Sequence, residues 1–377
     1  MEALPAGMLA RQLAEHRSLR VKLGIDPTAP DIHLGHVVVL TKLRQFQDAG
    51  HVVVLIIGDY TARVGDPSGR AVERPVLDDE EIDAHARRFQ EQAFKVLDPE
   101  RTEVRRNGEW LSMSSDDLFR LVRRFTVARL LEREEFSRRM AASEPISVLE
   151  LLYPILQGYD SVAVRADVEI GGTDQKFNLL FGREVQESLG VEPQSILTTP
   201  ILPGTDGVRR MSKSFGNYIG VTEPPEEMFG KLMSIPDAVM DDYYRLLLYE
   251  PLDPDCHPAE AKRELGRRLV ARFHGTEAAR EAETRFDQVH VRREVPEDVR
   301  VVRVEATANG EVHLPAVIAT AFGVSTSEAR RLLSQGGVKV DGQALGAERL
   351  DVPIGALDGK VLQIGKRRFA RVLDGRS

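Results

Sequence analysis

The chain has 377 residues, of which 42% are hydrophobic and 29% are charged, and its formal net charge at pH 7 is −8. At about 150 residues per domain, this length predicts two or three domains, each large enough to bury a core. No apolar run approaches the roughly 18 residues that a membrane span requires, and no export signal is visible at the N-terminus. We therefore expect a cytoplasmic protein without membrane contact. The acidic net charge also argues against a protein that coats nucleic acid indiscriminately.

Thiol and zinc chemistry are not expected. The single cysteine, Cys256, has no second cysteine with which to form an internal disulfide. No other thiol or histidine cluster lies beside it in the sequence, so we predict no metal site.

The N-terminal part predicts a strand–helix–strand unit of the nucleotide-binding kind. The apolar segments Leu19–Ile25 and Val52–Ile57 are typical of buried parallel strands. Between them we expect a helix from about Ile32 to Asp48, with Asp31 capping its first amides. In open parallel sheets, ligands bind beyond the carboxyl ends of the strands, so the turns after both strands should face the ligand.

The later segments extend this pattern. Residues from Asp78 to about Met140 are charged with helical periodicity, which predicts helices that cross to a later strand. That strand is expected at Ala166–Ile170, followed by a glycine turn and a helix over Lys176–Leu189. Residues 223–300 predict a helical module that includes a helix over Pro258–His274. The order of elements favours an α/β fold with a parallel sheet.

The motif His33-Leu34-Gly35-His36 places two imidazoles on one side of a helix start. Two such histidines could equally form a zinc pair or an ordinary polar first turn. The glycine favours a nucleotide, because a helix N-terminus offers amide donors and partial positive charge, and Gly35 permits close approach of a ligand. The phosphates and adenine of ATP fit this site, whereas the additional ligands that zinc needs are not evident.

A basic loop, Arg209-Arg210-Met211-Ser212-Lys213-Ser214-Phe215-Gly216-Asn217, lies far downstream and could by itself be a solvated surface loop. Together with the histidine motif, however, it resembles the paired HIGH and KMSKS signatures of the class I aminoacyl-tRNA synthetases, in the order of that family. Leu34 replaces the usual isoleucine, and Arg210 replaces the first lysine of the loop. The resemblance implies a Rossmann-like parallel-sheet catalytic domain.

A third cluster concerns the amino acid that is activated. Tyr153, Gln157 and Asp160 are spaced to share one face of a helix, which could be a plain helix exterior or a polar pocket. A buried Asp160 that accepts a phenolic hydrogen would be left unpaired if phenylalanine bound. The segment resembles the tyrosine pocket of the tyrosyl-tRNA synthetase family and not that of its tryptophanyl relatives.

This resemblance implies roles residue by residue. Gly171 and Asp174 would hold the ATP ribose, and Gln175 would contact the carboxylate or amino end of tyrosine. Asp66, Tyr153 and Gln157 would surround the α-ammonium group of tyrosine. The catalytic residues would be His33 and His36, which bind the ATP phosphates, and Arg210 and Lys213, which hold pyrophosphate. The complete ATP-binding set would be His33, Gly35, His36, Gly171, Asp174, Met211, Ser212, Lys213 and Ser214.

The reaction implied is attack of the tyrosine carboxylate on the α-phosphorus of ATP, followed by transfer of tyrosine to tRNA. The carboxylate is already ionised at neutral pH, so positioning and charge stabilisation should suffice. Mg²⁺ would arrive with ATP, and no tightly bound cofactor is expected.

One position departs from much of the family. Many members carry a tyrosine immediately before the turn that corresponds to Leu23–Thr28, and this chain has Lys22 there. A sub-branch of the bacterial enzymes resembles this version. The second contact to the phenol of the substrate is therefore left unassigned.

The segment from Leu314 to Val372 resembles the S-four-like RNA-binding fold. Ser325–Leu333 predicts a capped amphipathic helix, and Gln335–Gly342 predicts a turn into a hairpin. From Glu311 to Ser377 there are 10 Lys/Arg residues against 7 Asp/Glu, which favours RNA contact over a merely solubilising cap. The predicted RNA-binding residues are Arg330, Arg331, Lys339, Lys366, Arg367 and Arg368.

The expected organisation has three domains. A Rossmann-like catalytic domain would occupy 1–220, with a connecting and dimer-forming segment at about 110–155. An α-helical anticodon-region domain would follow at 221–305, and a small α+β RNA-binding domain at 311–377. The expected partners are L-tyrosine, ATP, tRNA(Tyr) and a second copy in a homodimer. The first alternative is a tryptophanyl-tRNA synthetase or another class I adenylating enzyme that kept the ATP motifs but changed its amino acid. The second is a non-catalytic RNA-binding protein.

Overall fold

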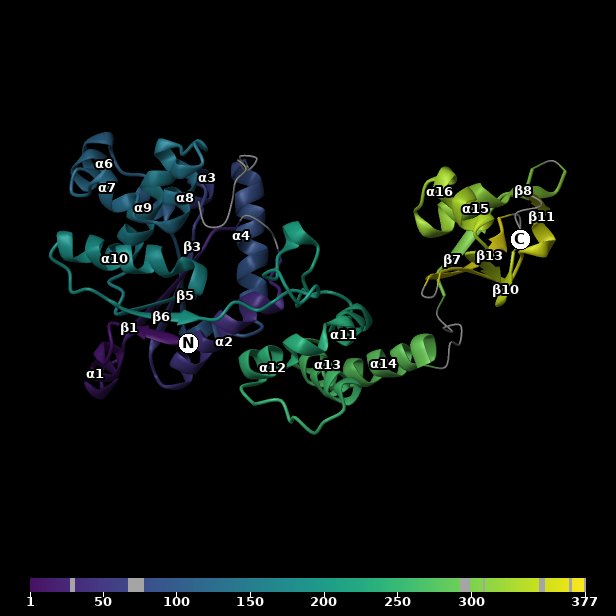
Figure 1. Cartoon of the computed structure of the whole chain (residues 1–377), viewed down its shortest axis with the longest axis horizontal. Helices are drawn as coiled ribbons and strands as arrows, with labels where there is room; N and C mark the ends of the chain where they lie inside the picture. The colour runs from purple at the N-terminus through teal and green to yellow at the C-terminus, as the bar shows by residue number, and fades with distance from the viewer. Residues whose placement is uncertain are drawn as a thin grey trace. The chain divides into compact units, whose positions relative to one another are not determined.

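The computed structural model describes residues 1–27, 31–66, 78–291, 299–307, 309–345, 350–365 and 368–375 (Figure 1). The chain divides into two compact units, Met1–His274 and Gly275–Ser377. Within the described ranges, no helix has both the length and the apolar character needed to cross a membrane.

The first unit is built on a six-stranded sheet with the order β1-β6-β5-β2-β3-β4. The neighbouring strands from β6 to β4 pair in parallel, and β1 pairs with β6 in the antiparallel sense. The central strands β3 and β5 are buried except at one end residue each, because helices cover both faces of such a sheet. The strands are β1 (Glu2–Leu4), β2 (Arg20–Ile25), β3 (Val52–Ile57), β4 (Thr102–Arg106), β5 (Val168–Gly172) and β6 (Ser195–Thr199).

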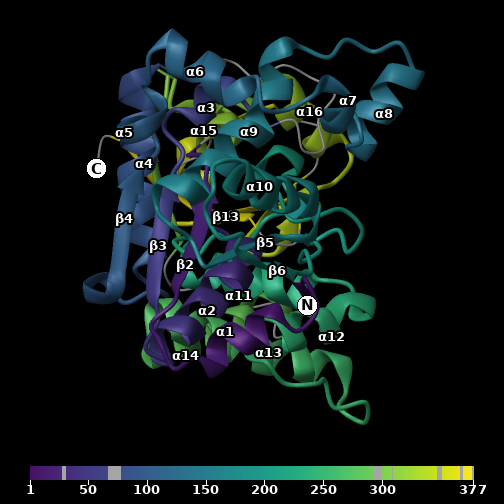
Figure 2. The same cartoon turned by 90° about the vertical axis from the view of Figure 1, so that its left-hand side faces the viewer.

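Helices α9 and α10 pack together on one side of this sheet, and α2 and α4 lie on the other side (Figures 1 and 2). The helices are α1 (Met8–Ala14), α2 (Leu34–Asp48), α3 (Thr61–Val64), α4 (Asp79–Ala93), α5 (Gly108–Leu111), α6 (Ser115–Val122), α7 (Val127–Leu130), α8 (Glu134–Ala141), α9 (Val148–Ala163), α10 (Lys176–Ser188), α11 (Pro225–Ser234), α12 (Met240–Tyr243) and α13 (Pro258–His274). Short helical turns are η1 (Pro99–Arg101), η2 (Thr173–Gln175), η3 (Lys213–Phe215), η4 (Asp237–Val239) and η5 (Tyr244–Leu248).

The predicted strand–helix–strand unit is confirmed as β2, α2 and β3. The predicted cap is wrong, because the N-cap of α2 is His33. The Asp31 carboxylate forms an ion pair with Lys213 instead. The edge strands β1 and β4 were not expected from the sequence.

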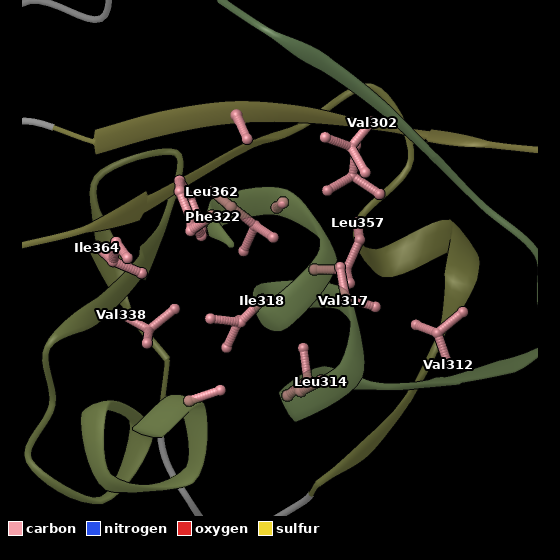
Figure 3. Close-up of a cluster of buried hydrophobic side chains, with 14 of the residues drawn as sticks. Val302, Val312, Leu314, Val317, Ile318, Phe322, Val338, Leu357, Leu362 and Ile364 are labelled. Carbon is pink, nitrogen blue, oxygen red and sulfur yellow. The ribbon is translucent and has the colours of Figure 1, made fainter. Parts of the chain in front are cut away.

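The second unit contains a five-stranded sheet with the order β10-β9-β12-β13-β7 and a two-stranded sheet of β11 and β8. Helix α15 and strands β9, β12 and β13 enclose a core that includes Leu314, Ile318, Val338 and Leu362 (Figure 3). The elements are α14 (Thr276–Phe286), η6 (Asp287–Val291), β7 (Val301–Val304), β8 (Glu311–His313), α15 (Leu314–Phe322), α16 (Thr326–Ser334), β9 (Val338–Val340), β10 (Gln343–Ala344), β11 (Asp351–Pro353), η7 (Ile354–Ala356), β12 (Val361–Ile364) and β13 (Arg368–Asp374).

The capped helix and the hairpin predicted in this unit are confirmed. The hydroxyl of Ser325 accepts a hydrogen bond from the Glu328 amide at 3.1 Å, which caps α16. Strands β9 and β10 form the antiparallel hairpin. The helices of the expected 221–305 domain are divided: α11, α12 and α13 belong to the first unit, and α14 belongs to the second.

Candidate active site

A cavity of about 560 Å³ opens beyond the carboxyl ends of β2, β3 and β5. This is the edge at which parallel sheets bind ligands. The cavity wall contains every residue that the sequence assigned to catalysis, ATP or tyrosine. These are Asp66, Tyr153, Gln157, Asp160 and Gln175 together with His33, Gly35, His36, Gly171, Asp174, Arg210, Met211, Ser212, Lys213 and Ser214.

The two imidazoles stack at the start of α2, with ring centroids 3.9 Å apart. Burial, reinforced by the charge of Lys213, lowers the pKa of His36 to about 4, and burial beside His36 and Lys213 holds the pKa of His33 well below its usual value. Both rings are therefore neutral at pH 7. The backbone amide of His33 donates to Nδ1 of His36 at 3.2 Å, so the proton of His36 is on Nε2 and available as a donor.

Gly35 has a steric role between these rings. A Cβ at this position would lie 3.0 Å from Nδ1 and Cε1 of His33. Any larger residue would therefore push the His33 ring away from the first turn of α2. Nδ1 of His33 is buried and has no hydrogen-bond partner in the described parts of the chain, so it remains available to a ligand.

The basic loop contributes its cations at the same end of the cavity. Lys213 Nζ lies 2.7 Å from Asp31 Oδ2, and Arg210 lies 2.9 Å from Asp174 Oδ2. Burial acts to raise the pKa of Asp31, but the hydrogen bond and charge of Lys213, with smaller contributions from Gln92 and Arg88, together lower it. Burial dominates at Asp174 and raises its pKa, although Arg210 opposes this shift.

The predicted face of α9 is confirmed as a helical stripe in the cavity wall. Ser147 caps this helix by accepting a hydrogen bond from the Glu150 amide at 3.1 Å. The Tyr153 hydroxyl donates to Asp26 Oδ2 at 2.9 Å. Burial and the neighbouring charge of Asp26 raise the pKa of Tyr153 well above its usual value, so it stays protonated. Oε1 of Gln157 is buried and lacks a partner among the described residues, which leaves an acceptor for a ligand.

Asp160 is buried and held by two donors from the chain beyond β4. Nε1 of Trp110 donates to its Oδ1 at 2.8 Å, and Nδ2 of Asn107 lies 3.3 Å from its Oδ2. Burial raises the pKa of Asp160 to about 6, while the charge of Lys22 and both hydrogen bonds oppose the rise. At pH 7 the group is thus mainly a carboxylate, which is an acceptor.

Sequence reasoning did not assign the residues that hold this network. Asp26 accepts from Tyr153 and from the Thr61 hydroxyl at 2.6 Å, and Asn107 donates to that same hydroxyl at 2.9 Å. Asp26 could have been found, because it directly follows the predicted strand β2. Asn107 and Trp110 follow β4, which was not predicted, so their approach to Asp160 had no signal in the sequence.

Gln175 and Asp66 both line the cavity and are hydrogen-bonded to each other. Nε2 of Gln175 donates to Oδ2 of Asp66 at 3.0 Å, and Oε1 of Gln175 accepts from Asn178 at 3.0 Å. Arg133 lies 3.8 Å from Asp66 and donates to Asn178 at 3.0 Å. The two predicted tyrosine-binding residues are therefore joined in one polar network with α10.

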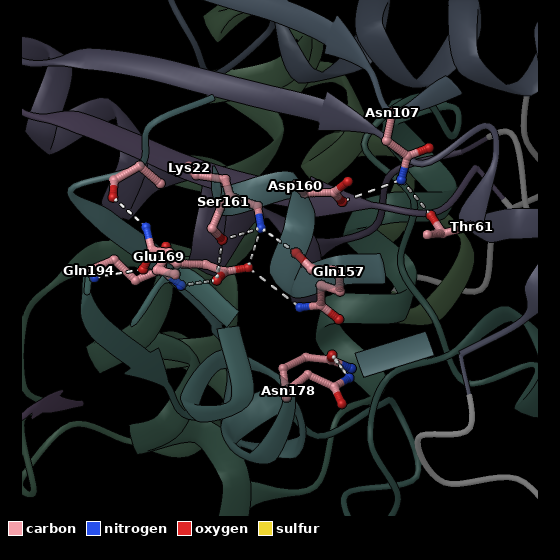
Figure 4. Close-up of polar contacts among 12 residues, drawn as sticks. Lys22, Thr61, Asn107, Gln157, Asp160, Ser161, Glu169, Asn178 and Gln194 are labelled. Atoms are coloured by element: carbon pink, nitrogen blue, oxygen red, sulfur yellow. Dashed lines mark hydrogen bonds and ion pairs between the residues drawn. The ribbon is translucent and has the colours of Figure 1, made fainter. Parts of the chain in front are cut away.

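Lys22, the position that departs from much of the family, is completely buried. Its ammonium group lies 2.9 Å from Oε1 of Glu169 on the neighbouring strand β5 (Figure 4). Glu169 lines the cavity, whereas Lys22 is not among the lining residues.

The predicted RNA-binding residues that the structure describes are exposed, on α16, β9 and β13. Arg331 pairs with Glu328, and the guanidinium of Arg368 donates to the carbonyl of Phe322. Lys366 and Arg367 lie outside the described residues.

The chain is similar to known proteins in sequence and in fold. The family described as tRNA synthetases class I (W and Y) matches residues 14–291. The tyrosine–tRNA ligase of Moorella thermoacetica is 50% identical over 97% of this chain and 90% of its own length. That of Thermotoga maritima is 50% identical over 95% of this chain and 91% of its own. A crystal structure of tyrosyl-tRNA synthetase from Archaeoglobus fulgidus complexed with L-tyrosine has 27% identity and a TM-score of 0.59, over 74% of this chain and 95% of its own.

The chain combines a parallel sheet with stacked imidazoles and a cationic loop beyond its carboxyl edge. The chain belongs to the class I tRNA synthetases and, within them, to the tyrosine–tRNA ligases. The family predicted from the two motifs and from the tyrosine pocket is confirmed.

Proposed function

We propose that this cavity joins L-tyrosine to ATP, giving tyrosyl-AMP and pyrophosphate, and that the chain then transfers tyrosine to the terminal ribose of tRNA(Tyr). The chain is an aminoacyl-tRNA synthetase, a ligase of protein biosynthesis that uses ATP as a substrate. One observation carries the assignment of the chemistry to this cavity. One part of the cavity wall carries the buried carboxylate of Asp160, and another part carries the imidazoles and cations of the two signature motifs.

The tyrosine end of the cavity suits a phenol and an ammonium group. The Asp160 carboxylate, held by Trp110 and Asn107, would accept the phenolic hydrogen of the substrate. The unpartnered Oε1 of Gln157 would accept from the α-ammonium group, together with Asp66 and the hydroxyl of Tyr153. Gln175 would orient the carboxylate for attack. An aromatic amino acid without the hydroxyl would cover the Asp160 carboxylate with a ring that donates no hydrogen bond to it, which is costly for a buried charge.

The opposite end suits a triphosphate. The neutral rings of His33 and His36 would donate N–H groups to phosphate oxygens as charge accumulates on them. Lys213 and Arg210 would leave Asp31 and Asp174 and hold the departing pyrophosphate. Asp174 is then free for the ribose, with Gly171 beside it. The carboxylate attacks phosphorus directly, so the chain supplies positioning and charge stabilisation without a covalent intermediate.

Mg²⁺ would enter as part of the ATP complex. Among the described residues, no three His, Cys, Asp or Glu side chains gather in a way that could hold a metal ion. The phosphate end carries the carboxylates of Asp31 and Asp174 as well as donors and cations, and the donors and cations fit the negative oxygens of magnesium-bound ATP. Mg²⁺ would shield phosphate charge there, and the protein would orient the nucleotide.

A second copy of the chain is the proposed partner at the segment 110–155. Five large apolar side chains in this segment are exposed, and Phe119 and Val148 are 68% and 74% exposed. The others are Val127, Met140 and Leu149. Apolar side chains concentrated in one segment are typical of a surface that is covered in an assembly.

The second unit is the proposed contact for tRNA. Its exposed cations, Arg330 on α16 and Lys339 on β9, would neutralise backbone phosphates, as would Arg331 and Arg368. Charged tRNA is consumed in translation, so we place the enzyme in the cytoplasm.

The test is amino-acid-dependent ATP–pyrophosphate exchange with the full chain and each of the twenty amino acids separately. Exchange with tyrosine alone is the expected result. Exchange with tryptophan would support the adenylation chemistry but contradict the assignment of the pocket to tyrosine. Failure to exchange with any amino acid would leave only the RNA-binding alternative.

A further inference from the structure

Lys22 and Glu169 form an ion pair beneath the tyrosine end of the cavity. The two residues are register partners on the adjacent parallel strands β2 and β5, and their side chains are 0% and 1% exposed. Removing two charges from water is costly, and apolar residues of similar size often serve stability as well or better. The pair is therefore poorly explained as a stabilising element, and its contacts indicate another role.

Those contacts reach the helix that carries the tyrosine-binding residues. Lys22 Nζ donates to the backbone carbonyl of Gln157 at 3.0 Å and to the hydroxyl of Ser161 at 2.8 Å, in addition to its 2.9 Å ion pair with Glu169 (Figure 4). The three N–H groups of the ammonium are thus matched by three protein acceptors. Lys22 could contact the substrate only by losing one of these three interactions.

Glu169 contacts the same turn of α9. Its Oε1 lies 3.4 Å from Nε2 of Gln157, and its Oε2 accepts from the Ser161 hydroxyl at 3.2 Å and from the amide of Gln194. Both the backbone and the side chain of Gln157 are therefore fixed by the ion pair. The free acceptor of Gln157, Oε1, is left in the cavity wall.

We propose that Lys22 is a positioning residue for tyrosine recognition, which holds α9 so that Gln157 and Asp160 face the substrate and which does not contact the substrate itself. This inference rests on the proposed function, because it concerns how the same pocket recognises tyrosine.

The charge of Lys22 also favours recognition of tyrosine, as its contacts with α9 do. Burial raises the pKa of Asp160, and Lys22 is the largest of the effects that oppose the rise, ahead of the hydrogen bonds from Trp110 and Asn107. The charge of Glu169 adds to the rise. Lys22 thus helps to keep Asp160 ionised as the acceptor for the phenol.

The test removes both charges together, because a single substitution would leave one buried and unpaired. The double variant Lys22→Met/Glu169→Gln is expected to raise the KM for tyrosine about 10-fold, since small displacements of binding groups are costly, and to leave the KM for ATP unchanged. The matched control is Arg20→Met/Glu103→Gln, which removes an ion pair between β2 and β4 whose side chains are 32% and 33% exposed. The control should leave both KM values unchanged.

A double-mutant cycle with Gln157→Ala distinguishes positioning from direct contact. If Lys22 acts through Gln157, the loss in kcat/KM for tyrosine from combining the changes should be smaller than the product of the separate losses. Losses that multiply, or an unchanged KM for tyrosine in the double variant, would overturn the inference.

If the double variant does not fold, the single variant Ser161→Ala tests the same inference. It deletes the hydroxyl that links α9 to both Lys22 and Glu169, and Ser161 is not among the residues that line the cavity. We expect the KM for tyrosine to rise about 3-fold, because two supporting hydrogen bonds are lost while the Lys22 contact to the Gln157 carbonyl remains. An unchanged KM would count against the positioning role. Absence of tyrosine-dependent exchange in the unmodified chain would instead defeat the proposed function.

Discussion

The ionisation states of single residues divide the cavity into two kinds of chemistry. The pKa values of His33 and His36 are low because both rings are buried beside Lys213. In the proposed function these imidazoles would act as neutral donors, and the positive charge at the phosphate end would come from Lys213 and Arg210. At the other end, Asp160 provides negative charge where a phenol is to be recognised.

The proposed role of Lys213 predicts that its loss slows adenylate formation but hardly changes tyrosine binding. Lys213→Ala should lower the rate of tyrosine-dependent exchange about 100-fold, because a cation that stabilises the departing pyrophosphate acts mainly in the transition state. Tyrosine affinity should change less than about 2-fold. Trp110, the only tryptophan in the chain, donates to Asp160, so its fluorescence can report tyrosine binding.

The control for this change is Arg209→Ala, which removes the neighbouring cation. Arg209 pairs with Asp206 and is not among the cavity-lining residues, so its loss should leave the exchange rate nearly unchanged. A large loss of tyrosine affinity in Lys213→Ala with an unchanged rate would refute the assigned role.

The raised pKa of Asp160 predicts a pH-dependent specificity. A carboxyl group is charged above its pKa and neutral below it, and burial places this pKa at about 6. The preference for tyrosine over phenylalanine, measured as the ratio of kcat/KM values, should therefore fall as pH decreases through about 6. Because kcat/KM reports the free enzyme, the midpoint should reflect Asp160 before substrate binds. A ratio that is flat from pH 8 to pH 5 would contradict this.

The site residues were predictable to different degrees. Those on contiguous motifs, such as His33 and Lys213, could be assigned because one signature carries several residues at fixed spacing. Asp160 followed from helical periodicity and from its chemistry. Asn107 and Lys22 act through contacts between segments far apart in the sequence, and no local pattern reveals such contacts.

At the scale of secondary-structure elements, burial decides what the sequence could predict. The strand β3 is an uninterrupted apolar run because helices cover both of its faces, so its bounds were predicted correctly. The strand β4, Thr102–Arg106, lies at the edge of the sheet, is half-buried and carries three charged residues. Its composition gives no strand signal, and Asn107 and Trp110, which follow β4 and hold Asp160, were missed with it.

The loop that carries Arg210 and Lys213 has its own support. Asn217 is buried; its Oδ1 accepts from the Ser212 amide at 2.8 Å, and its Nδ2 donates to Asp206 at 3.0 Å and to the Arg210 carbonyl at 3.1 Å. The loop is thus tied across its base by a single side chain.

Loss of this support should affect catalysis more than tyrosine binding. Asn217→Ala is expected to lower kcat for exchange about 10-fold, because Arg210 and Lys213 would lose their fixed position. Tyrosine affinity, read from Trp110 fluorescence, should stay the same. Asn217→Asp keeps the acceptor for Ser212 and should lose less activity. An unaltered kcat in the alanine variant would show that the loop does not depend on Asn217.

At the scale of the whole molecule, the exposed apolar residues between 110 and 155 predict a homodimer. Phe119→Glu/Val148→Glu should convert it to a monomer of 42.0 kDa, measured by light scattering, because two charges per copy would be desolvated in the interface. Leu13→Glu, an exposed apolar position on α1 outside this segment, serves as the control. A native protein that is already monomeric at micromolar concentration would contradict the prediction.

The division into units was only partly accessible from the sequence. The S-four-like segment could be located because its capped helix, α16, and its β9–β10 hairpin have local signatures. The place where compact units separate depends on packing between helices, and α13 and α14 are alike in composition although the division falls between them. The three-domain scheme therefore stays a prediction, as do the RNA contacts of Arg330 and Lys339.

The central claim is that this cavity selects tyrosine through Asp160. The measurement is the ratio of kcat/KM values for tyrosine and phenylalanine in ATP–pyrophosphate exchange, compared between the native chain and Asp160→Asn. Asparagine has nearly the same shape but no charge, so the ratio should fall about 100-fold, mostly through loss of activity with tyrosine. An unchanged ratio would remove Asp160 from tyrosine recognition and contradict the account.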